Sequence, residues 1–184
     1  MKKVLSTIFT LIATSSFAEP RVGLTFGIND LVYSYYGWEY GETNQSPIGV
    51  FFGYDHSFGR VFVGGEVAAT IGTERWEYYT HDETGNGTPV AIDMKLRAGY
   101  KHNGFSVYGF GGITKYSNVE WSHGSYFSSG EGSIYGVGLE KTFGNFLVGV
   151  EYSQRILELD YNKPYISGED LKGEEVTVRI GWSF

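Results

Sequence analysis

The strongest constraint on this chain is a strict two-residue alternation at its C-terminal end, over residues 176–184. One face of this segment is apolar throughout, with Val176, Val178, Ile180, Trp182 and Phe184. The other face is small, polar or charged, with Thr177, Arg179, Gly181 and Ser183. Because successive side chains of a strand point to opposite faces, the pattern predicts a β-strand with one apolar face.

Seven earlier segments repeat this alternation. They cover residues 22–29, 48–55, 61–71, 90–100, 105–116, 135–143 and 146–155. Between residue 19 and the end of the chain we find no sustained helical spacing, and 27 glycines oppose helix formation. The sequence therefore predicts an all-β protein of eight antiparallel strands. The alternation is least regular over 105–116, where we expect Tyr108 and Phe110 outward and Gly109 and Gly111 inward.

The connections between these segments alternate in length. Short Gly- and Asn-rich turns are expected at 56–60, 102–104 and 144–145, and long connections at 37–46, 73–88, 119–132 and 160–173. Sorting of this kind is typical of a transmembrane up-and-down barrel, with short periplasmic turns and longer extracellular loops. A soluble sandwich has no reason to sort its connections in this way.

Eight charged residues lie in the middle of strands, on the face opposite the apolar one. They are Glu66, Asp93, Lys95, Arg97, Glu140, Glu151, Arg155 and Arg179. If these residues faced water, large aromatic side chains would have to fill an eight-stranded barrel, which is only just wide enough for side chains. We therefore expect the apolar face to meet lipid and the charges to face the lumen with Gly, Ser and Thr. Four acids and four bases can pair there, which favours a closed lumen over an open channel.

Aromatic residues gather near both ends of the strands, which indicates two interfacial girdles. The set near the short turns is Tyr54, Tyr100, Phe105, Phe143, Phe146, Trp182 and Phe184. The set toward the long loops is Tyr33, Tyr35, Tyr36, Trp38, Tyr40, Trp76, Tyr78, Tyr79, Tyr116 and Trp121. Aromatics at exposed loop ends are alternatively binding hot spots.

The first 18 residues have the plan of a signal peptide. Lys2 and Lys3 precede a mostly apolar stretch at 4–17, and small residues stand at Ser16 and Ala18. The mature chain would then begin at Glu19 and form one barrel domain over 19–184. It keeps 12 basic and 21 acidic residues, a net charge of −9 that disfavours nucleic acid as a partner. The chain has no cysteine, so disulfides do not stabilise the exported domain.

Taken together, the leader, the eight alternating segments and the closing strand resemble the small OmpA/OmpX-type outer-membrane barrels. The resemblance implies that Ile180, Trp182 and Phe184 form the closing-strand signal that the barrel-assembly machinery reads. It also implies a monomer in the bacterial outer membrane, with both termini periplasmic, four loops extracellular, and membrane lipid and lipopolysaccharide as surroundings.

Residues with catalytic potential are few. His123-Gly124-Ser125, with Glu131 nearby, has the spacing that a lipid A deacylase of this architecture uses. It lies in a Gly- and Ser-rich loop, however, and loops hold catalytic geometry poorly. Many loop residues are acidic, without a recognisable metal-ligand spacing. The acids are Glu39, Glu42, Glu74, Glu77, Asp82, Glu83, Glu120, Glu131, Glu169, Asp170, Glu174 and Glu175. We expect no catalytic residues, no metal and no cofactor.

The sequence thus predicts a non-enzymatic surface barrel that contributes to envelope integrity, or to binding and adhesion through its loops. Three alternatives stay open: a narrow porin-like channel, a lipid A-modifying enzyme and a soluble lipocalin-like carrier. Conductance in a planar bilayer, an altered lipid A acyl pattern and solubility without detergent would respectively identify them. An extracellular ligand would bind through the loops.

Overall fold

The computed structural model describes residues 17–35, 38–72, 74–78, 84–120, 126–161 and 167–184. These residues form ten strands and no helix, and none of them offers a helix that is long and apolar enough to cross a membrane. The strands are β1 (Phe17–Tyr35), β2 (Trp38–Gln45), β3 (Ile48–Phe58), β4 (Val61–Ile71), β5 (Glu74–Tyr78), β6 (Thr84–His102), β7 (Phe105–Glu120), β8 (Tyr126–Phe143), β9 (Phe146–Tyr161) and β10 (Ser167–Ser183).

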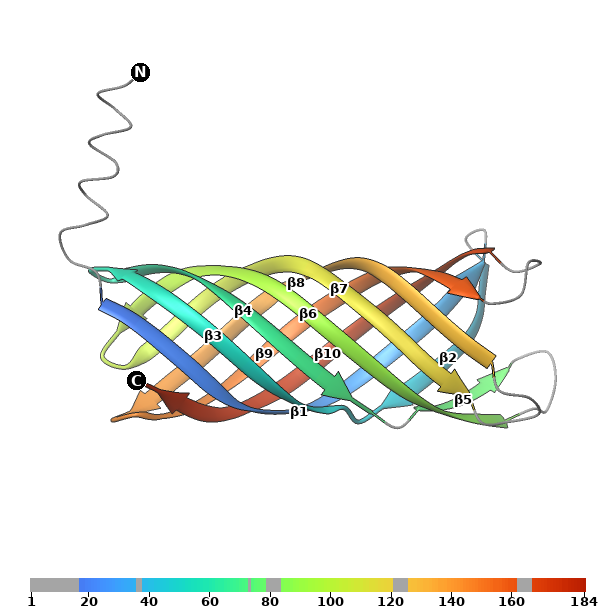
Figure 1. Cartoon of the computed structure of the whole chain (residues 1–184), viewed down its shortest axis with the longest axis horizontal. Coiled ribbons are helices and arrows are strands. Elements are labelled where there is room, and N and C mark those ends of the chain that lie inside the picture. The colour runs from blue at the N-terminus through green and yellow to red at the C-terminus, as the bar shows by residue number, and fades with distance from the viewer. Residues whose placement is uncertain (1–16, 36–37, 73, 79–83, 121–125, 162–166) are drawn as a thin grey trace, which may run out of the picture.

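Eight of these strands close into a single antiparallel barrel (Figure 1). The order around the wall is β1, β3, β4, β6, β7, β8, β9 and β10, and β10 pairs back onto β1. The closing ladder runs from Arg21 opposite Ser183 to Tyr35 opposite Glu169. The predicted eight-stranded antiparallel barrel is therefore confirmed. β1 begins at Phe17, inside the predicted leader, and the cleavage site after Ala18 stays a prediction.

The two remaining strands extend the wall at the loop end. β2 pairs with β1 and with β5, and β5 pairs with β6. β2 therefore continues the barrel position of β3, and β5 continues that of β4. The interruption lies at Pro47, which has no N–H to donate to a ladder. Its carbonyl accepts a hydrogen bond from Gly27 N at 2.8 Å, and Gly72 N donates to Pro89 O at 2.9 Å.

This extension corrects the predicted bounds of the long connections. Most of residues 37–46 is strand β2, β8 already begins at Tyr126, and β10 begins at Ser167. The polar, glycine-rich composition of these stretches is typical of loops. Hydrogen bonding between neighbouring strands does not require an apolar face, however, so the ladders continue beyond the alternating segments.

The short turns all lie at the other end of the barrel, as predicted. Two of them are shorter than the predicted 56–60 and 102–104, because β3 continues to Phe58 and β6 to His102. Gly59, Asn103, Gly104 and Gly144 have positive φ angles of 67°, 49°, 75° and 62°. Positive φ at two successive residues is what a two-residue type I′ hairpin turn requires, and Asn103 and Gly104 provide it. The start of β1 and the C-terminus lie at this same end (Figure 1), which we call the turn end.

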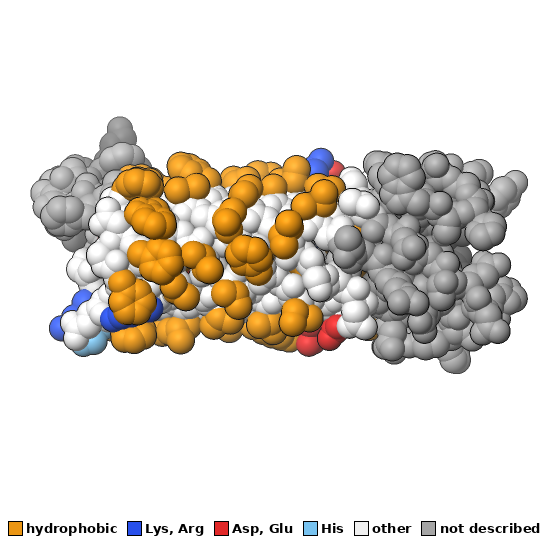
Figure 2. All heavy atoms as spheres, turned by 90° about the horizontal axis from the view of Figure 1, so that it is seen from below, with side chains coloured by type: hydrophobic (Ala, Val, Ile, Leu, Met, Phe, Trp, Pro, Cys, Tyr) orange, Lys and Arg blue, Asp and Glu red, His pale blue; other side chains and the backbone are white. Residues whose placement is uncertain are grey.

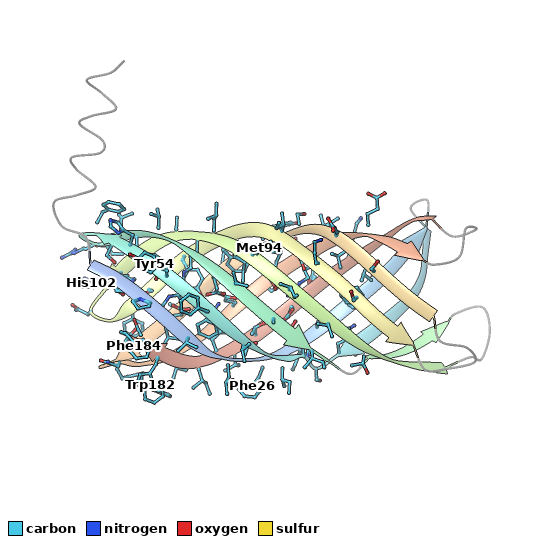
Figure 3. The ribbon with its side chains drawn as sticks, in the orientation of Figure 1. Phe26, Tyr54, Met94, His102, Trp182 and Phe184 are labelled. Carbon is cyan, nitrogen blue, oxygen red and sulfur yellow. The ribbon has the colours of Figure 1, made fainter. Side chains whose placement is uncertain are left out.

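Outward side chains form an apolar band around the wall. Each barrel strand contributes exposed members, for example Phe26, Phe52, Val67, Met94, Val107, Val137, Val150 and Val178. Figure 2 shows part of this band on the face in view, with Lys, Arg and His side chains at the turn end. Figure 3 shows Phe26 and Trp182 pointing away from the barrel. Most residues of the predicted apolar faces thus lie on the outside of the barrel.

The predicted facing of β7 is wrong. Tyr108 and Phe110 are buried in the lumen, at 3% and 8% exposure, whereas Val107 and Ile113 face outward. Gly109 and Gly111 also lie on the outward face. The glycines at 109, 111 and 112 blur the alternation in the sequence, so the choice of face depends on what the lumen can hold.

Candidate functional site: an ion network in the lumen

All eight mid-strand charged residues lie on the lumen face of the barrel, and none is more than 8% exposed. They come from five strands: Glu66 from β4, Asp93, Lys95 and Arg97 from β6, Glu140 from β8, Glu151 and Arg155 from β9, and Arg179 from β10. The structure divides them into two groups. Six belong to a network toward the turn end, and Asp93 and Arg155 belong to a smaller cluster toward the loops.

The turn-side network consists of Arg21, Asp55, Glu66, Lys95, Arg97, Glu140, Glu151 and Arg179. Arg179 is at its centre and is fully buried. Its guanidinium lies 2.5 Å from the Glu66 carboxylate and 3.4 Å from that of Glu140, and it also contacts Glu151. One cation thus connects three carboxylates that come from three different strands.

The other cations of the turn-side network also contact more than one carboxylate. Lys95 Nζ lies 2.9 Å from both Glu66 and Glu151. Arg97 donates to both oxygens of Glu140, at 3.1 and 2.9 Å, the bidentate arrangement that fixes both partners. Because each of these ions has at least two partners, the network crosses the lumen from wall to wall.

Two members of this network, Arg21 and Asp55, were not among the predicted site residues. Arg21 Nε lies 3.3 Å from Asp55, and its other nitrogens lie 3.3 Å from Glu66 and 3.2 Å from Glu140. The alternation of 48–55 already places Asp55 on the same face as Gly49 and Gly53. The signal was present, but both residues stand at segment ends, where wetted positions are the ordinary expectation.

Aromatic rings fill the space around the charges, contrary to the expectation of a lumen lined by Gly, Ser and Thr. Phe51, Phe62, Tyr108 and Phe110 are all buried there. The Arg97 guanidinium lies 3.6 Å from the Tyr108 ring centroid, and that of Arg179 lies 4.0 Å from the Phe51 centroid. These are cation–π contacts, which strengthen where water is displaced.

Inward glycines make room for these rings. A Cβ on Gly138 would lie 2.3 Å from the Tyr108 ring, and one on Gly136 would lie 2.7 Å from the Phe110 ring. With this room, the Tyr108 hydroxyl reaches Glu140 at 2.9 Å and Glu151 at 2.7 Å. Small residues opposite large ones are how this narrow lumen accommodates both rings and charges.

The loop-side cluster has Arg155 at its centre. Arg155 lies 2.7 Å from Asp93 and also contacts Glu175, which accepts a hydrogen bond from Thr177 Oγ1 at 2.7 Å. Glu175 was predicted to be a loop acid; that expectation is wrong, because β10 extends through it and turns it inward. Toward the loops the lumen is capped by an apolar layer of Leu31, Ala91, Tyr116, Leu157 and Leu171. Tyr116 is buried here, which corrects its predicted place in the outer girdle.

At the turn end the lumen opens into a recess of about 390 Å³. Lys101 lies at its edge, with Nζ 2.6 Å from Glu19 and 3.3 Å from Asp55. Arg21 and Glu140 also line the recess, so it extends inward as far as the turn-side network.

The remaining predicted residues lie partly inside and partly outside the described residues. His123-Gly124-Ser125 lies outside the described residues, as do the side chains of the predicted loop-end aromatics other than Tyr116. Glu131 is described: it is exposed and forms an ion pair with Lys115 at 2.6 Å. Ile180, Trp182 and Phe184 are exposed on the outward face of β10 and at the end of the chain.

The sequence profile of the family described as "Outer membrane protein beta-barrel domain" matches residues 4–184. No curated protein sequence matches the chain at a significant level.

Solved structures share the fold at low sequence identity. Ail, the attachment invasion locus protein of Yersinia pestis, was solved in complex with the heparin analogue sucrose octasulfate. It is 18% identical with a TM-score of 0.55, over 90% of this chain and 99% of that one. OprG of Pseudomonas aeruginosa is 12% identical with a TM-score of 0.55, over 91% and 95%. Neisserial surface protein A is 9% identical with a TM-score of 0.51, over 90% and 98%.

Proposed function

The chain belongs to the outer membrane protein beta-barrel domain family, and from this premise we propose that it is a non-conducting, non-enzymatic barrel that anchors surface loops. Its place is the bacterial outer membrane, where the apolar band meets lipid. The turn end with both termini faces the periplasm, and the four long connections face outward. In this role the barrel contributes to envelope integrity, or to binding and adhesion through its loops.

The observation that carries this proposal is the closure of the lumen. The turn-side network joins opposite walls through ions that each have several partners, and rings of Phe51, Phe62 and Tyr108 pack against them. Beyond it, the apolar layer around Leu157 and Leu171 forms a second barrier. A water-filled path for ions would have to pass both.

Conductance of the refolded protein in a planar bilayer tests closure. We expect no steady open conductance from the natural sequence, with a known porin as the positive control. The double variant Glu66→Ala, Arg179→Ala removes one acid and one base from the lumen. Because this opens space in the network, we expect more frequent channel openings in the current trace. Glu131→Ala, Lys115→Ala removes the exposed pair on the outer wall and is the matched control. Steady conductance of the natural sequence would contradict the proposal in favour of a channel.

The closing strand carries the proposed assembly signal. Ile180, Trp182 and Phe184 present their side chains outward at the turn end, on a strand that pairs with both β1 and β9. We expect Phe184→Asp to lower the amount of folded barrel recovered from outer membranes. Refolding into detergent, which needs no machinery, should proceed as before. Equal loss in both assays would indicate a folding defect instead.

The loops decide which ligands the surface can take. The four long connections as predicted contain 11 acidic and 3 basic residues. Ail was solved with a sulfated heparin analogue, but an acidic surface repels such a polyanion. We therefore propose that the loops of this chain bind neutral or cationic partners. Heparin-column retention tests this: we expect none at physiological salt, and salt-dependent retention would overturn it.

Unchanged lipid A in cells lacking the protein is the corresponding expectation for a non-enzymatic barrel.

A further inference from the structure

The two halves of the lumen differ in net charge. The turn-side network has four carboxylates (Asp55, Glu66, Glu140 and Glu151) and four cations (Arg21, Lys95, Arg97 and Arg179), so it is balanced. Glu19 and Lys101 at the recess balance each other as well. The loop-side cluster has two carboxylates, Asp93 and Glu175, for the single cation Arg155. Among the described lumen residues, one negative charge is therefore left over, and it lies in the loop-side half.

A small cavity lies at the same place. It has a volume of about 20 Å³, and its lining includes Asn29, Gln45, Arg155 and Glu175. A volume of this size holds one water molecule or one small ion. Leu31 and Leu157 of the apolar layer also line the cavity.

Asn29 lines this cavity and has a side-chain oxygen without a hydrogen-bond partner among the described residues. Its side chain is only 5% exposed, and its Oδ1 accepts no hydrogen bond from the described residues. On the ladder between β1 and β10, Asn29 stands directly opposite Glu175. Directly opposite residues on one face have Cβ atoms about 5 Å apart, and both residues line the cavity, so their side chains meet at one point on its wall.

We infer that this point is a binding site for a monovalent alkali cation, with Na⁺ as the fitting ion. Carboxylate and amide oxygens are the ligands that hard cations prefer. Asp93 and Glu175 share Arg155 as their one cation, so one further positive charge would neutralise the cluster, and buried charges are stabilised when they are balanced. The competing occupant is a water molecule, since Gln45 Nε2 also lacks a partner there; water would supply hydrogen bonds and no charge.

Linkage between Na⁺ binding and folding tests the inference. The protein is refolded into detergent micelles, and urea unfolding is measured in mixtures of NaCl and choline chloride at constant total salt. An ion that binds only the folded state lowers the ratio of unfolded to folded protein tenfold for each tenfold rise in concentration above its dissociation constant. We expect that dependence for the natural sequence. Equal stability in NaCl and choline chloride would overturn the site.

Neutralising variants locate the ion. Glu175→Gln removes the surplus charge and is expected to abolish the Na⁺ dependence. Glu174→Gln is the matched control, because Glu174 is the neighbouring residue on the exposed outer face and should leave the dependence unchanged. Asp93→Asn neutralises the same cluster from another strand and should also abolish it, which provides a second route if Glu175→Gln does not fold. A dependence that survives both neutralising variants would also overturn the inference.

Discussion

The two halves of the lumen use buried charge in different ways. In the turn-side half, eight ions share partners, so Glu66 alone lies within 3.6 Å of Arg21, Lys95, Arg97 and Arg179. In the loop-side half of the lumen, Arg155 is the sole cation among the described residues. The rest of this half is filled by the apolar layer that includes Leu157 and Leu171. One half is held by a cross-linked network, the other by one ion cluster and packing.

The difference shows how a narrow barrel stabilises a polar interior. Burying an ion is unfavourable unless its partners are well placed, and the loss of a partner then leaves an uncompensated charge. In a network with shared partners, an ion that loses one partner keeps others. The central ions contact the most partners, so their removal should destabilise the network most. In the loop-side cluster the balance is already uneven, so removal of an acid there should be tolerated better than removal of a base.

Replacing the central cation should have the largest effect. Arg179→Met keeps an unbranched apolar chain in place and leaves Glu66, Glu140 and Glu151 short of a shared cation. We expect a loss of about 3–5 kcal/mol in the free energy of unfolding, as for other broken buried pairs. Urea unfolding of the protein in detergent micelles measures it. Arg60→Met, an exposed arginine that donates to Tyr100 at 3.0 Å, is the control and should change stability by about 0.5 kcal/mol or less.

Removing one acid from each half separates the two directly. Glu66→Gln leaves an extra positive charge among four cations, and we expect a loss of about 3 kcal/mol, the upper range for hydrogen bonds to charged groups. Asp93→Asn removes a surplus carboxylate while Arg155 keeps Glu175, so the expected loss is about 1 kcal/mol or less in choline chloride. Equal losses, measured in the same urea titration, would remove the distinction between the halves.

Filling the space beside a lumen ring should have an intermediate effect. Gly138→Ala places a Cβ 2.3 Å from the Tyr108 ring and forces that ring away from Glu140 and Glu151. Overpacking of this kind destabilises by about 1–3 kcal/mol. Gly109→Ala on the neighbouring strand β7 is the control, because its Cβ would find nothing closer than 3.8 Å. Tyrosine fluorescence and thermal unfolding of both variants report the change; similar values would indicate that Tyr108 moves freely.

The smallest effect is expected outside the barrel. Lys115 and Glu131 form an ion pair at 2.6 Å, but both side chains are more than half exposed. Exposed pairs of this kind contribute about 0–1 kcal/mol because water screens them. Lys115→Ala should therefore leave the urea midpoint nearly unchanged. If Lys115→Ala lowered the free energy of unfolding as much as Glu66→Gln, the contribution of a charge to stability would not depend on whether it lies in the lumen or on the outer face.

The sequence determined the class of fold and much of the lumen. Strict alternation with an apolar face, together with three short turns and charges in mid-strand, leaves few architectures other than a barrel with its apolar side outward. The inward positions of Glu66, Glu140 and Arg179 follow from this period alone, because in a strand the face of one residue fixes the face of every second residue.

What the sequence could not decide depends on contacts between distant strands. The facing of Tyr108 and Phe110 follows from the room that Gly136 and Gly138 leave on β8, which no local pattern of β7 reveals. Glu175 becomes a lumen ligand because β10 continues to pair with β9 beyond its alternating segment. The partners of each ion, and the surplus charge beside Asn29, emerge only when the barrel closes and brings β1 against β10, more than 130 residues apart in the chain.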